Sequence, residues 1–331
     1  MKALTLLNIK EALQYIDAPK PSITNAAEVI VQIQAAAINH RDVYITQGLY
    51  AGIQTPAILG SDGVGIVVEA GENAQEWLQK SVIINPNCDW GNNDRVQGQA
   101  YKVLGMPSQG TMSEFIKLNK DRLAEKPVHL SIEEAAALPL AGLTAYRALI
   151  GRAQAQSGER VLISGVGGGV ALNAMQFAIA LGMEVWVTSG KDEKIQKAIS
   201  LGAKGGVNYK TPNWHKTLMA EAKGGFDVII DSAGGEGFGL FMDIANPAAR
   251  IAFYGGTLGK STFSPQRVFW KQIDILGCTM GNDKEFAQMV ALVDKFQIRP
   301  IVDSVYNMTE GQAAFDYLDS GLQFGKVVLK P

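Results

Sequence analysis

A glycine-rich segment runs from Gly165 to Ala171 with the sequence GVGGGVA. It follows a short apolar run, Arg160–Ser164, and leads into a longer one, Val170–Leu181. Glycines let the backbone turn sharply and approach a pyrophosphate, and the start of a helix offers unpaired N–H groups to that anion. The motif is informative only between a strand and a helix, which is its context here. We therefore predict a dinucleotide site. Its phosphate contacts are expected from Gly167, Gly168, Gly169 and Val170.

The residues about 20 positions beyond the glycines indicate which dinucleotide is bound, because an NAD site usually carries Asp or Glu there to hold the ribose hydroxyls. Here the strand-like run Glu184–Ser189 ends without an acid. Asp192 and Glu193 fall in the first turn of the next helix, where acids complement the helix dipole. The nearby lysines are either solvated helix residues or ligands of a 2′-phosphate. We favour the second reading and predict NADPH. Its 2′-phosphate contacts are expected from Ser189, Lys191, Lys194 and Tyr209.

The composition narrows the class of protein. With 331 residues, 47% hydrophobic and 19% charged, the chain is long enough for two globular domains. A net charge of −2 gives no field that would recruit nucleic acid or an anionic membrane. We find no signal peptide and no uncharged apolar stretch of about 18–20 residues. Two distant cysteines, Cys88 and Cys278, fit a reducing cytoplasm and exclude a four-cysteine zinc site.

The pattern of elements changes twice along the chain. Residues 1–120 read as short strands and turns, and Glu28–Ala35 alternates polar and apolar side chains as a half-buried strand does. From Ser131, short apolar strands alternate with helices, which is typical of a doubly wound parallel sheet. After about residue 262 the pattern is mixed again and ends on a strand-like run, Gly325–Leu329. We therefore predict an α/β protein in which a nucleotide-binding domain, 122–261, is inserted in a β-rich domain of residues 1–121 and 262–331.

Further motifs support a family resemblance over nearly the full length. The segment Asn39–Tyr44 reads NHRDVY, Pro139–Tyr146 reads PLAGLTAY, and Gly325–Val328 reads GKVV. In this order around the glycine-rich turn, the chain resembles the medium-chain dehydrogenase/reductases. Within them it is similar to quinone oxidoreductases, enoyl reductase domains and zinc-type alcohol-dehydrogenase-like proteins. The resemblance implies a GroES-like catalytic domain interrupted by a Rossmann domain.

The chain departs from the zinc-using members of this family. Their catalytic ligands are a Cys, a Gly-His-Glu segment and a Cys before Gly-Leu-Thr. The matching positions here hold Asn39, Gly60-Ser61-Asp62 and Ala141. Catalytic zinc needs about three protein ligands, and a set made of His40, Asp62 and Cys88 has no recognisable ligand spacing. We therefore predict no catalytic metal.

Without a metal, hydrogen-bond donors must stabilise the negative charge that a hydride brings to the substrate. The resemblance offers Tyr44 as a donor of a proton or a hydrogen bond, although a tyrosine here is also explained as a packed residue with a satisfied hydroxyl. Asn39 and Asp42 are expected to position the nicotinamide, the pocket wall or each other. Thr144 is expected beside the nicotinamide, and Gly255 and Thr257 are expected to close over the cofactor.

These observations predict a cytoplasmic, zinc-free oxidoreductase that transfers hydride from NADPH to a quinone or to a C=C conjugated with a carbonyl. The alternatives are a reductase of 2-enoyl thioesters and a non-catalytic NADPH-binding sensor. We expect a small-molecule substrate and no nucleic acid or membrane partner. The resemblance also implies a homo-oligomer, either a dimer or a tetramer.

Overall fold

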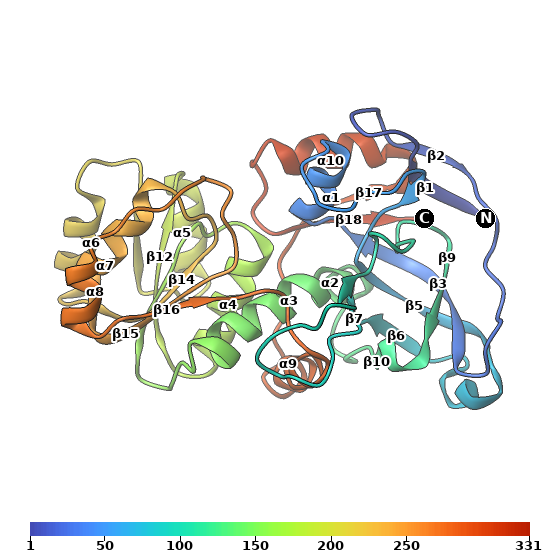
Figure 1. Ribbon diagram of the computed structural model, residues 1–331, viewed down its shortest axis with the longest axis horizontal. Helices are drawn as coiled ribbons and strands as arrows, with labels where there is room; N and C mark the ends of the chain where they lie inside the picture. The colour runs from blue at the N-terminus through green and yellow to red at the C-terminus, as the bar shows by residue number, and fades with distance from the viewer. The chain divides into compact units, whose positions relative to one another are not determined.

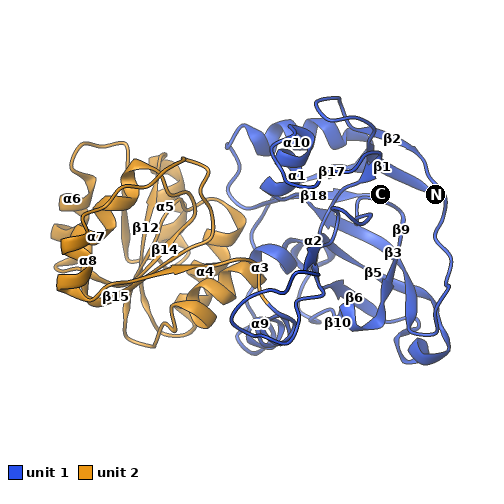
Figure 2. Ribbon diagram, in the orientation of Figure 1, with its two compact units in different colours: residues 1–141, 282–331 blue, residues 142–281 orange.

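A computed structural model describes every residue from Met1 to Pro331. The chain forms two compact units (Figure 2): unit 1 comprises Met1–Ala141 and Asn282–Pro331, and unit 2 comprises Gly142–Gly281. Unit 2 is thus inserted into unit 1, in agreement with the predicted fold class. None of the helices has both the length and the apolar character that a membrane span requires.

The junctions between the units lie further along the chain than the expected boundaries, at 141/142 rather than 121/122 and at 281/282 rather than 261/262. Helix α2 (Ile132–Ala137) packs against strands β3 (Glu28–Ala37) and β5 (Asp62–Ala70), and therefore belongs to unit 1. Strand β16 (Asp274–Gly277) pairs with β15 (Ala245–Phe253) and therefore belongs to unit 2. Long-range packing thus sets both junctions.

Unit 1 is built on two main sheets (Figure 1). The smaller has the strand order β2-β1-β4, and the larger has the order β10-β6-β5-β3-β18-β17, with β9 also paired to β3. Strand β18 (Lys326–Lys330) comes from the C-terminal segment and pairs antiparallel with β3. The other strands are β1 (Lys2–Leu6), β2 (Gln14–Asp17), β4 (Ala57–Ile58), β6 (Ser81–Ile84), β7 (Asn87–Cys88), β8 (Lys102–Val103), β9 (Phe115–Asn119), β10 (Leu123–Glu125) and β17 (Val302–Asn307).

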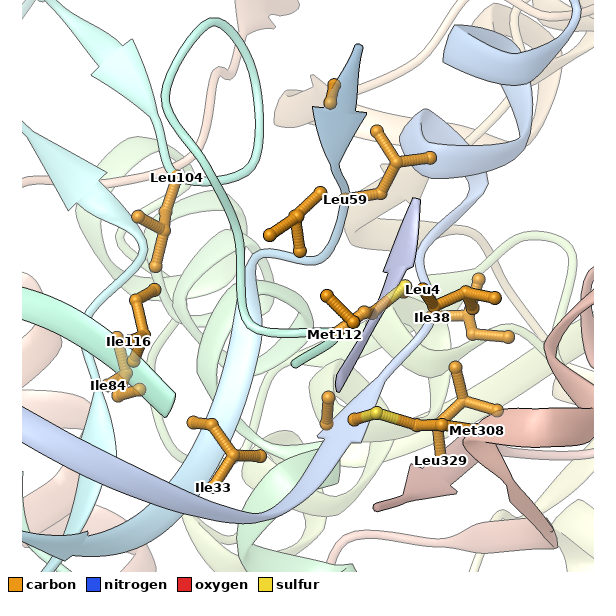
Figure 3. Packing of buried hydrophobic residues seen from close by; sticks show 14 of the residues in the cluster. Leu4, Ile33, Ile38, Leu59, Ile84, Leu104, Met112, Ile116, Met308 and Leu329 are labelled. Carbon is orange, nitrogen blue, oxygen red and sulfur yellow. The ribbon is translucent and has the colours of Figure 1, made fainter. Parts of the chain in front are cut away.

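The core of unit 1 joins both chain segments. Leu4, Ile38, Met112 and Leu329 lie in one buried cluster (Figure 3). Ser131 caps the start of helix α2, and its hydroxyl and the Glu134 carboxylate form a capping box. The remaining helices of this unit are α1 (His40–Thr46), η1 (Glu72–Trp77), η2 (Lys120–Arg122), α9 (Asp283–Lys295), η5 (Met308–Glu310) and α10 (Gly311–Asp319), and α3 (Pro139–Tyr146) contains the first junction.

Unit 2 is a six-stranded parallel sheet with the order β13-β12-β11-β14-β15-β16. Numbered within the unit this is 3-2-1-4-5-6, the order of doubly wound dinucleotide-binding sheets, in which ligands bind where the order reverses, at the carboxyl ends of the strands. That point lies between β11 (Arg160–Ile163) and β14 (Phe226–Asp231). The other elements are β12 (Glu184–Ser189), β13 (Gly205–Asn208), η3 (Arg147–Arg152), α4 (Gly169–Ala180), α5 (Asp192–Ser200), α6 (Trp214–Ala222), η4 (Glu236–Leu240), α7 (Phe241–Ile244) and α8 (Pro265–Lys271).

Candidate active site

The glycine-rich turn connects β11 to α4 in unit 2. Gly165 and Gly167 have φ values of 66° and 127°, which side chains other than glycine rarely adopt. Gly168 is the N-cap of the 12-residue helix α4, with φ −82° and ψ 154°. A Cβ atom placed on Gly168 would meet no heavy atom within 4 Å. The turn therefore leaves open space directly before a helix N-terminus, where a phosphate group fits.

Asp231, at the end of β14, holds this turn in place. Its Oδ1 accepts a hydrogen bond from the Ser164 hydroxyl at 2.5 Å, and its Oδ2 accepts from the Gly234 N–H at 2.8 Å. A Cβ on Gly165 would lie 2.8 Å from the Ser232 hydroxyl oxygen, so the two strand ends are tightly packed. Asp231 was not among the sequence-based candidates. The sequence feature that could have identified Asp231 is its place as the acid at the end of the apolar run FDVIID.

The residues that are expected to contact a 2′-phosphate lie near the glycine turn and the end of β12. A Cβ on Gly167 would lie 3.1 Å from Lys194 Nζ, so this ammonium lies over the glycine turn. A Cβ on Gly190 would lie 2.8 Å from the Tyr209 hydroxyl, and Ser189 is buried beside it. Lys191 is the N-cap of α5, and its N–H is 3.4 Å from Ser189 Oγ.

The first acid after the end of β12, Asp192, is already hydrogen-bonded within the protein. Asp192 Oδ1 accepts a hydrogen bond from Asn208 Nδ2 at 2.9 Å, so it lies at the α5–β13 side. The end of β12 therefore carries a hydroxyl and two ammonium groups, Lys191 and Lys194, without an acid committed to a ribose. This arrangement fits an anionic substituent.

The remaining predicted cofactor contacts lie at two other places in unit 2. Gly255 follows β15 and packs so closely on the residue after β14 that a Cβ there would lie 2.0 Å from the Ser232 carbonyl oxygen. Thr257, two residues further, is exposed. Thr144 in α3 is 6% exposed, and its hydroxyl oxygen lies 3.8 Å from Met280 Sδ. Next to Gly255, burial and then the Asp231 carboxylate raise the pKa of Tyr254 above its usual value.

A cluster of charged and amide side chains is buried in unit 1. Asn39, the residue before α1, is 8% exposed, and Asp62 at the start of β5 is fully buried. Asn39 Nδ2 donates to Asp62 Oδ2 at 2.9 Å. Lys326 at the start of β18 donates from Nζ to both partners, at 2.5 Å to Asn39 Oδ1 and 2.9 Å to Asp62 Oδ2. The cluster thus joins the start of α1, the start of β5 and the start of β18, which are far apart in sequence.

Lys326 was missed by sequence reasoning, although the motif that contains it was noted. The signal was a lysine that opens an otherwise apolar strand, GKVVL, because lysines are almost never fully buried unless they are paired. Its partner Asp62 was considered only as a metal ligand. Their sequence separation of 264 residues hides the pairing from any local pattern.

Asp42 has a structural place in the same region. Its Oδ2 accepts a hydrogen bond from the Asn39 backbone N–H at 2.9 Å, which holds the first turn of α1. Arg41 Nη1 lies 3.8 Å from its other oxygen. Burial raises the pKa of Asp42 above its usual value, while Arg41 and the Asn39 N–H act in the opposite direction. Of the roles left open for Asn39 and Asp42, contact with each other is the one observed.

Tyr44 lies elsewhere on α1. It is partly exposed, and burial followed by the Asp319 carboxylate raises the pKa of its phenol. Asp319, on α10, lines a cavity of about 460 Å³ together with Val43 and Thr46. No hydrogen bond joins Tyr44 to Asn39, Asp62 or Lys326. Tyr44 is therefore on the α10 side of α1 and outside the buried cluster.

The positions that hold zinc ligands in zinc-using relatives do not fit a metal here. Asn39 and Asp62 bind each other and the Lys326 ammonium, and a cation at that point repels a second cation. Ser61 donates to the Leu104 carbonyl at 2.7 Å, and Ala141 has no ligand atom. No three His, Cys, Asp or Glu side chains gather anywhere as a metal site, so His40, Asp62 and Cys88 do not form one.

The polar segment Asn85–Gly98 is held by hydrogen bonds within unit 1. Asp283, at the start of α9, accepts from Asn87 Nδ2 at 2.7 Å and from Arg122 Nη2 at 2.7 Å. Trp90 is 3% exposed and donates to the Asn93 carbonyl at 2.9 Å. Trp90 therefore anchors this loop.

Comparisons with known proteins agree with both units. Residues 25–128 match the family described as alcohol dehydrogenase GroES-like domain, and residues 169–295 match the family described as zinc-binding dehydrogenase. A zinc-type alcohol dehydrogenase-like protein of Leptosphaeria maculans is 34% identical, over 92% of this chain and 90% of its own. A solved NAD-dependent alcohol dehydrogenase matches all of both chains with a TM-score of 0.92 and 32% identity.

Two further relatives are reductases by name. Quinone oxidoreductase of Mus musculus is 27% identical, over 93% of this chain and 90% of its own. Crotonyl-CoA reductase of Streptomyces avermitilis is 26% identical, over 96% of this chain and 82% of its own. With a relative above 30% identity over nearly the whole length and both domain families in the expected order, the chain belongs to the medium-chain dehydrogenase/reductase family of oxidoreductases, alongside the zinc-type alcohol dehydrogenase-like proteins.

Proposed function

We propose that this protein is an NADPH-dependent reductase of quinones or of C=C bonds conjugated with a carbonyl, and that it works without zinc. The observation that carries the proposal is the buried Asn39–Asp62–Lys326 cluster. In it, Asn39 and Asp62, at two of the positions matched to zinc-ligand segments, are hydrogen-bonded to each other and to the Lys326 ammonium. Quinones, enones and enals are activated acceptors, so hydrogen bonds are sufficient to polarise them.

The proposed cofactor is NADPH, which supplies the hydride when it is bound. The open space over Gly168 at the start of α4 supports binding of the pyrophosphate. Ser189, Lys191, Lys194 and Tyr209 support the 2′-phosphate, because they gather at the end of β12 and the nearby Asp192 is bound to Asn208. We further propose Thr144, Gly255 and Thr257 as contacts of the nicotinamide half.

The test is NADPH consumption by the purified protein with a panel of acceptors. The proposal expects turnover with 1,4-benzoquinone, cyclohexenone or an unbranched enal, and none with saturated aldehydes. It also expects no stoichiometric zinc in metal analysis and full activity in the presence of a chelator. Zinc near one per chain, with activity lost to the chelator, would refute the zinc-free mechanism.

A second candidate function is reduction of 2-enoyl thioesters, which the resemblance to crotonyl-CoA reductase supports. It differs from the first in the thioester group attached to the acceptor's carbonyl carbon and not in the hydride chemistry. Including crotonyl-CoA in the same panel separates the two by kcat/KM. Tight NADPH binding without turnover of any acceptor would instead indicate a non-catalytic sensor.

We also propose a homo-oligomer that associates through unit 2, in a reducing cytoplasm where Cys88 and Cys278 stay free. Strand β16 is the edge of the six-stranded sheet, and Phe269 and Trp270 just before it are 64% and 83% exposed. An unpaired strand edge beside exposed aromatic rings is a surface that a second copy covers well. Light scattering should show more than one chain per particle, and Trp270→Glu should reduce it to one.

A further inference from the structure

The Lys326 ammonium has no hydrogen left for a substrate. It is 4% exposed, and its three N–H groups match three oxygen atoms: the Ile38 carbonyl at 2.8 Å, Asn39 Oδ1 at 2.5 Å and Asp62 Oδ2 at 2.9 Å. An ammonium has three donors and no acceptor. Any effect of Lys326 on a reaction therefore passes through the groups that it holds.

Both carboxylate oxygens of Asp62 are also hydrogen-bonded within the protein. Its Oδ2 accepts from Lys326 and from Asn39 Nδ2, and its Oδ1 accepts from the Leu140 backbone N–H at 2.7 Å. The carboxylate is fully buried. It contributes a fixed negative charge on one side of the Asn39 amide, while Lys326 contributes a fixed positive charge on the other.

These two charges dictate how the Asn39 amide is oriented. An ammonium only donates hydrogen bonds, so the amide oxygen must face Lys326, and a carboxylate only accepts, so the amide nitrogen must face Asp62. Rotating the amide by half a turn would place two donors against each other and two acceptors against each other. Burial removes the water that would soften this cost. The amide is thus locked in one orientation.

One N–H of this locked amide remains open. An amide nitrogen carries two N–H groups, and Asn39 Nδ2 has a single acceptor in the structure, Asp62 Oδ2. Asn39 is 8% exposed, so the second N–H is almost withdrawn from water. A buried donor without an acceptor is costly and rare in folded proteins. Lys326 also polarises the amide through its oxygen, which strengthens the remaining donor.

We propose that the open N–H of Asn39 binds the carbonyl oxygen of the substrate, with Lys326 and Asp62 as positioning residues; this rests on the function proposed above. When hydride forms the new C–H bond at the β-carbon, the C=C electron pair moves toward the carbonyl and negative charge builds on its oxygen. A fixed donor stabilises that enolate oxygen. A proton from solvent then completes the reduction at the α-carbon. The substrate class is any acceptor with an oxygen conjugated to the reducible bond.

The direct test is Asn39→Asp, which keeps the shape and removes the donor at any pH where the introduced carboxyl is ionised; the neighbouring Asp62 carboxylate will raise the pKa of that carboxyl. It should lower kcat with cyclohexenone by about 10²–10³-fold, the usual effect of losing one such donor. NADPH affinity should be unchanged. Activity should return as pH falls, because the introduced carboxyl regains an O–H when protonated. The charged groups near Asn39 are Asp62, Lys326, Asp42 and Arg41, and the adjacent His40 is titratable.

The positioning role is tested by Lys326→Met, with Lys271→Met as a matched control. Lys271 Nζ in unit 2 also donates to three oxygens, the carbonyls of Met242, Asp243 and Ala245, but it contacts neither the Asn39 cluster nor the glycine turn. Both variants should lose thermal stability. Only Lys326→Met should lower kcat, by about 10-fold or more, because a loosened donor is misplaced. Equal kcat in the two variants would overturn the positioning role.

A binding experiment separates this inference from the proposed function. The ¹⁵N side-chain signals of Asn39, identified by their absence in Asn39→Asp, should show one shifted N–H when the unreactive ketone cyclohexanone is added. A shift in a protein that reduces no acceptor would refute the proposed function and leave the donor assignment intact. Turnover of acceptors with Asn39→Asp within about twofold of the unaltered protein, or no shift, would overturn the donor assignment while the proposed function stands.

Discussion

The two candidate sites are built from different chemical groups, one from backbone and the other from side chains. In unit 2 the anion site is made by backbone: glycines at φ 66° and 127°, a helix N-terminus and the open space over Gly168. In unit 1 the polar site is made by three side chains: Lys326 neutralises Asp62, and both hydrogen-bond to the Asn39 amide. A backbone site depends on shape and fails when atoms are added. A site of paired charges depends on the neutralisation of each charge by its partner, and it fails when one charge is removed, even if the shape is kept.

The largest effect should come from adding atoms to the backbone site. Gly168→Val fills the space over the turn without a backbone penalty, because φ is −82° and no atom lies within 4 Å. NADPH binding should become undetectable by fluorescence titration while Tm stays close to that of the unaltered protein. Gly237→Val is the control, since this glycine also faces open space. Unchanged NADPH affinity would show that phosphate binds elsewhere.

Removing one charge from the unit 1 cluster should mainly reduce stability. Asp62→Asn keeps the shape but leaves the buried Lys326 ammonium without its carboxylate, and breaking a buried pair costs about 3–5 kcal/mol. Urea unfolding followed by circular dichroism measures this loss. Asp17→Asn is the control, because the Lys2–Asp17 pair is 45% and 83% exposed and an ion pair in contact with solvent contributes little to stability. Similar losses in the two variants would contradict the view of the cluster as a balanced, buried unit.

The two sites differ in how far the sequence alone predicts them. The turn from β11 to α4 was predicted almost residue by residue because its signals are local: a strand, glycines and a helix within about 20 residues. The pairing of Asp62 with Lys326 spans 264 residues and depends on β18 pairing with β3. The sequence does not predict the domain junctions for the same reason. Helix α2 belongs to unit 1 because of the strands on which it packs, and its own composition does not indicate this.

Tyr44 tests whether a group outside both sites takes part in catalysis. If its phenol delivers the proton, Tyr44→Phe should lower kcat by about 10²-fold and leave NADPH affinity unchanged, because general acids contribute about 10²–10⁴-fold. Steady-state kinetics with cyclohexenone measures both. A rise in KM alone would indicate substrate positioning, and a lower Tm with normal kinetics would assign Tyr44 to packing against α10.

A smaller effect is expected for cofactor preference. Lys194, whose Nζ lies over the glycine turn, is one of the proposed contacts of the 2′-phosphate. Lys194→Glu should reduce the preference for NADPH over NADH by about tenfold, the loss of one charge-assisted contact. Lys216→Glu, an exposed lysine of α6, should leave the preference unchanged. Tighter binding of NADH than NADPH by the unaltered protein would show that the missing acid after β12 was misread.

The smallest effect concerns the loop of Asn85–Gly98. Partial burial acts to raise the pKa of Asp283, but hydrogen bonds from Arg122 outweigh it and hold the pKa below its usual value. A lowered pKa stabilises the fold above the ordinary carboxyl pKa of about 3.9, and this contribution is lost as pH falls through the folded value. The Tm difference between the unaltered protein and Asp283→Asn should therefore be present at about pH 7 and shrink below about pH 4. A difference that persists in acid would refute the charge argument.

The insertion of unit 2 also has a consequence for biosynthesis. Strands β3 and β5 of unit 1 leave the ribosome early, but β18, which pairs with β3 and carries Lys326, is made only after the whole of Gly142–Gly281. Domains generally fold as units during synthesis. Unit 2 is one continuous segment and can complete its sheet first, while the nascent unit 1 holds Asp62 without its cation. A chain that terminates before β18 would therefore keep the nucleotide turn and lack a stable partner domain, which makes it a natural target for cellular quality control.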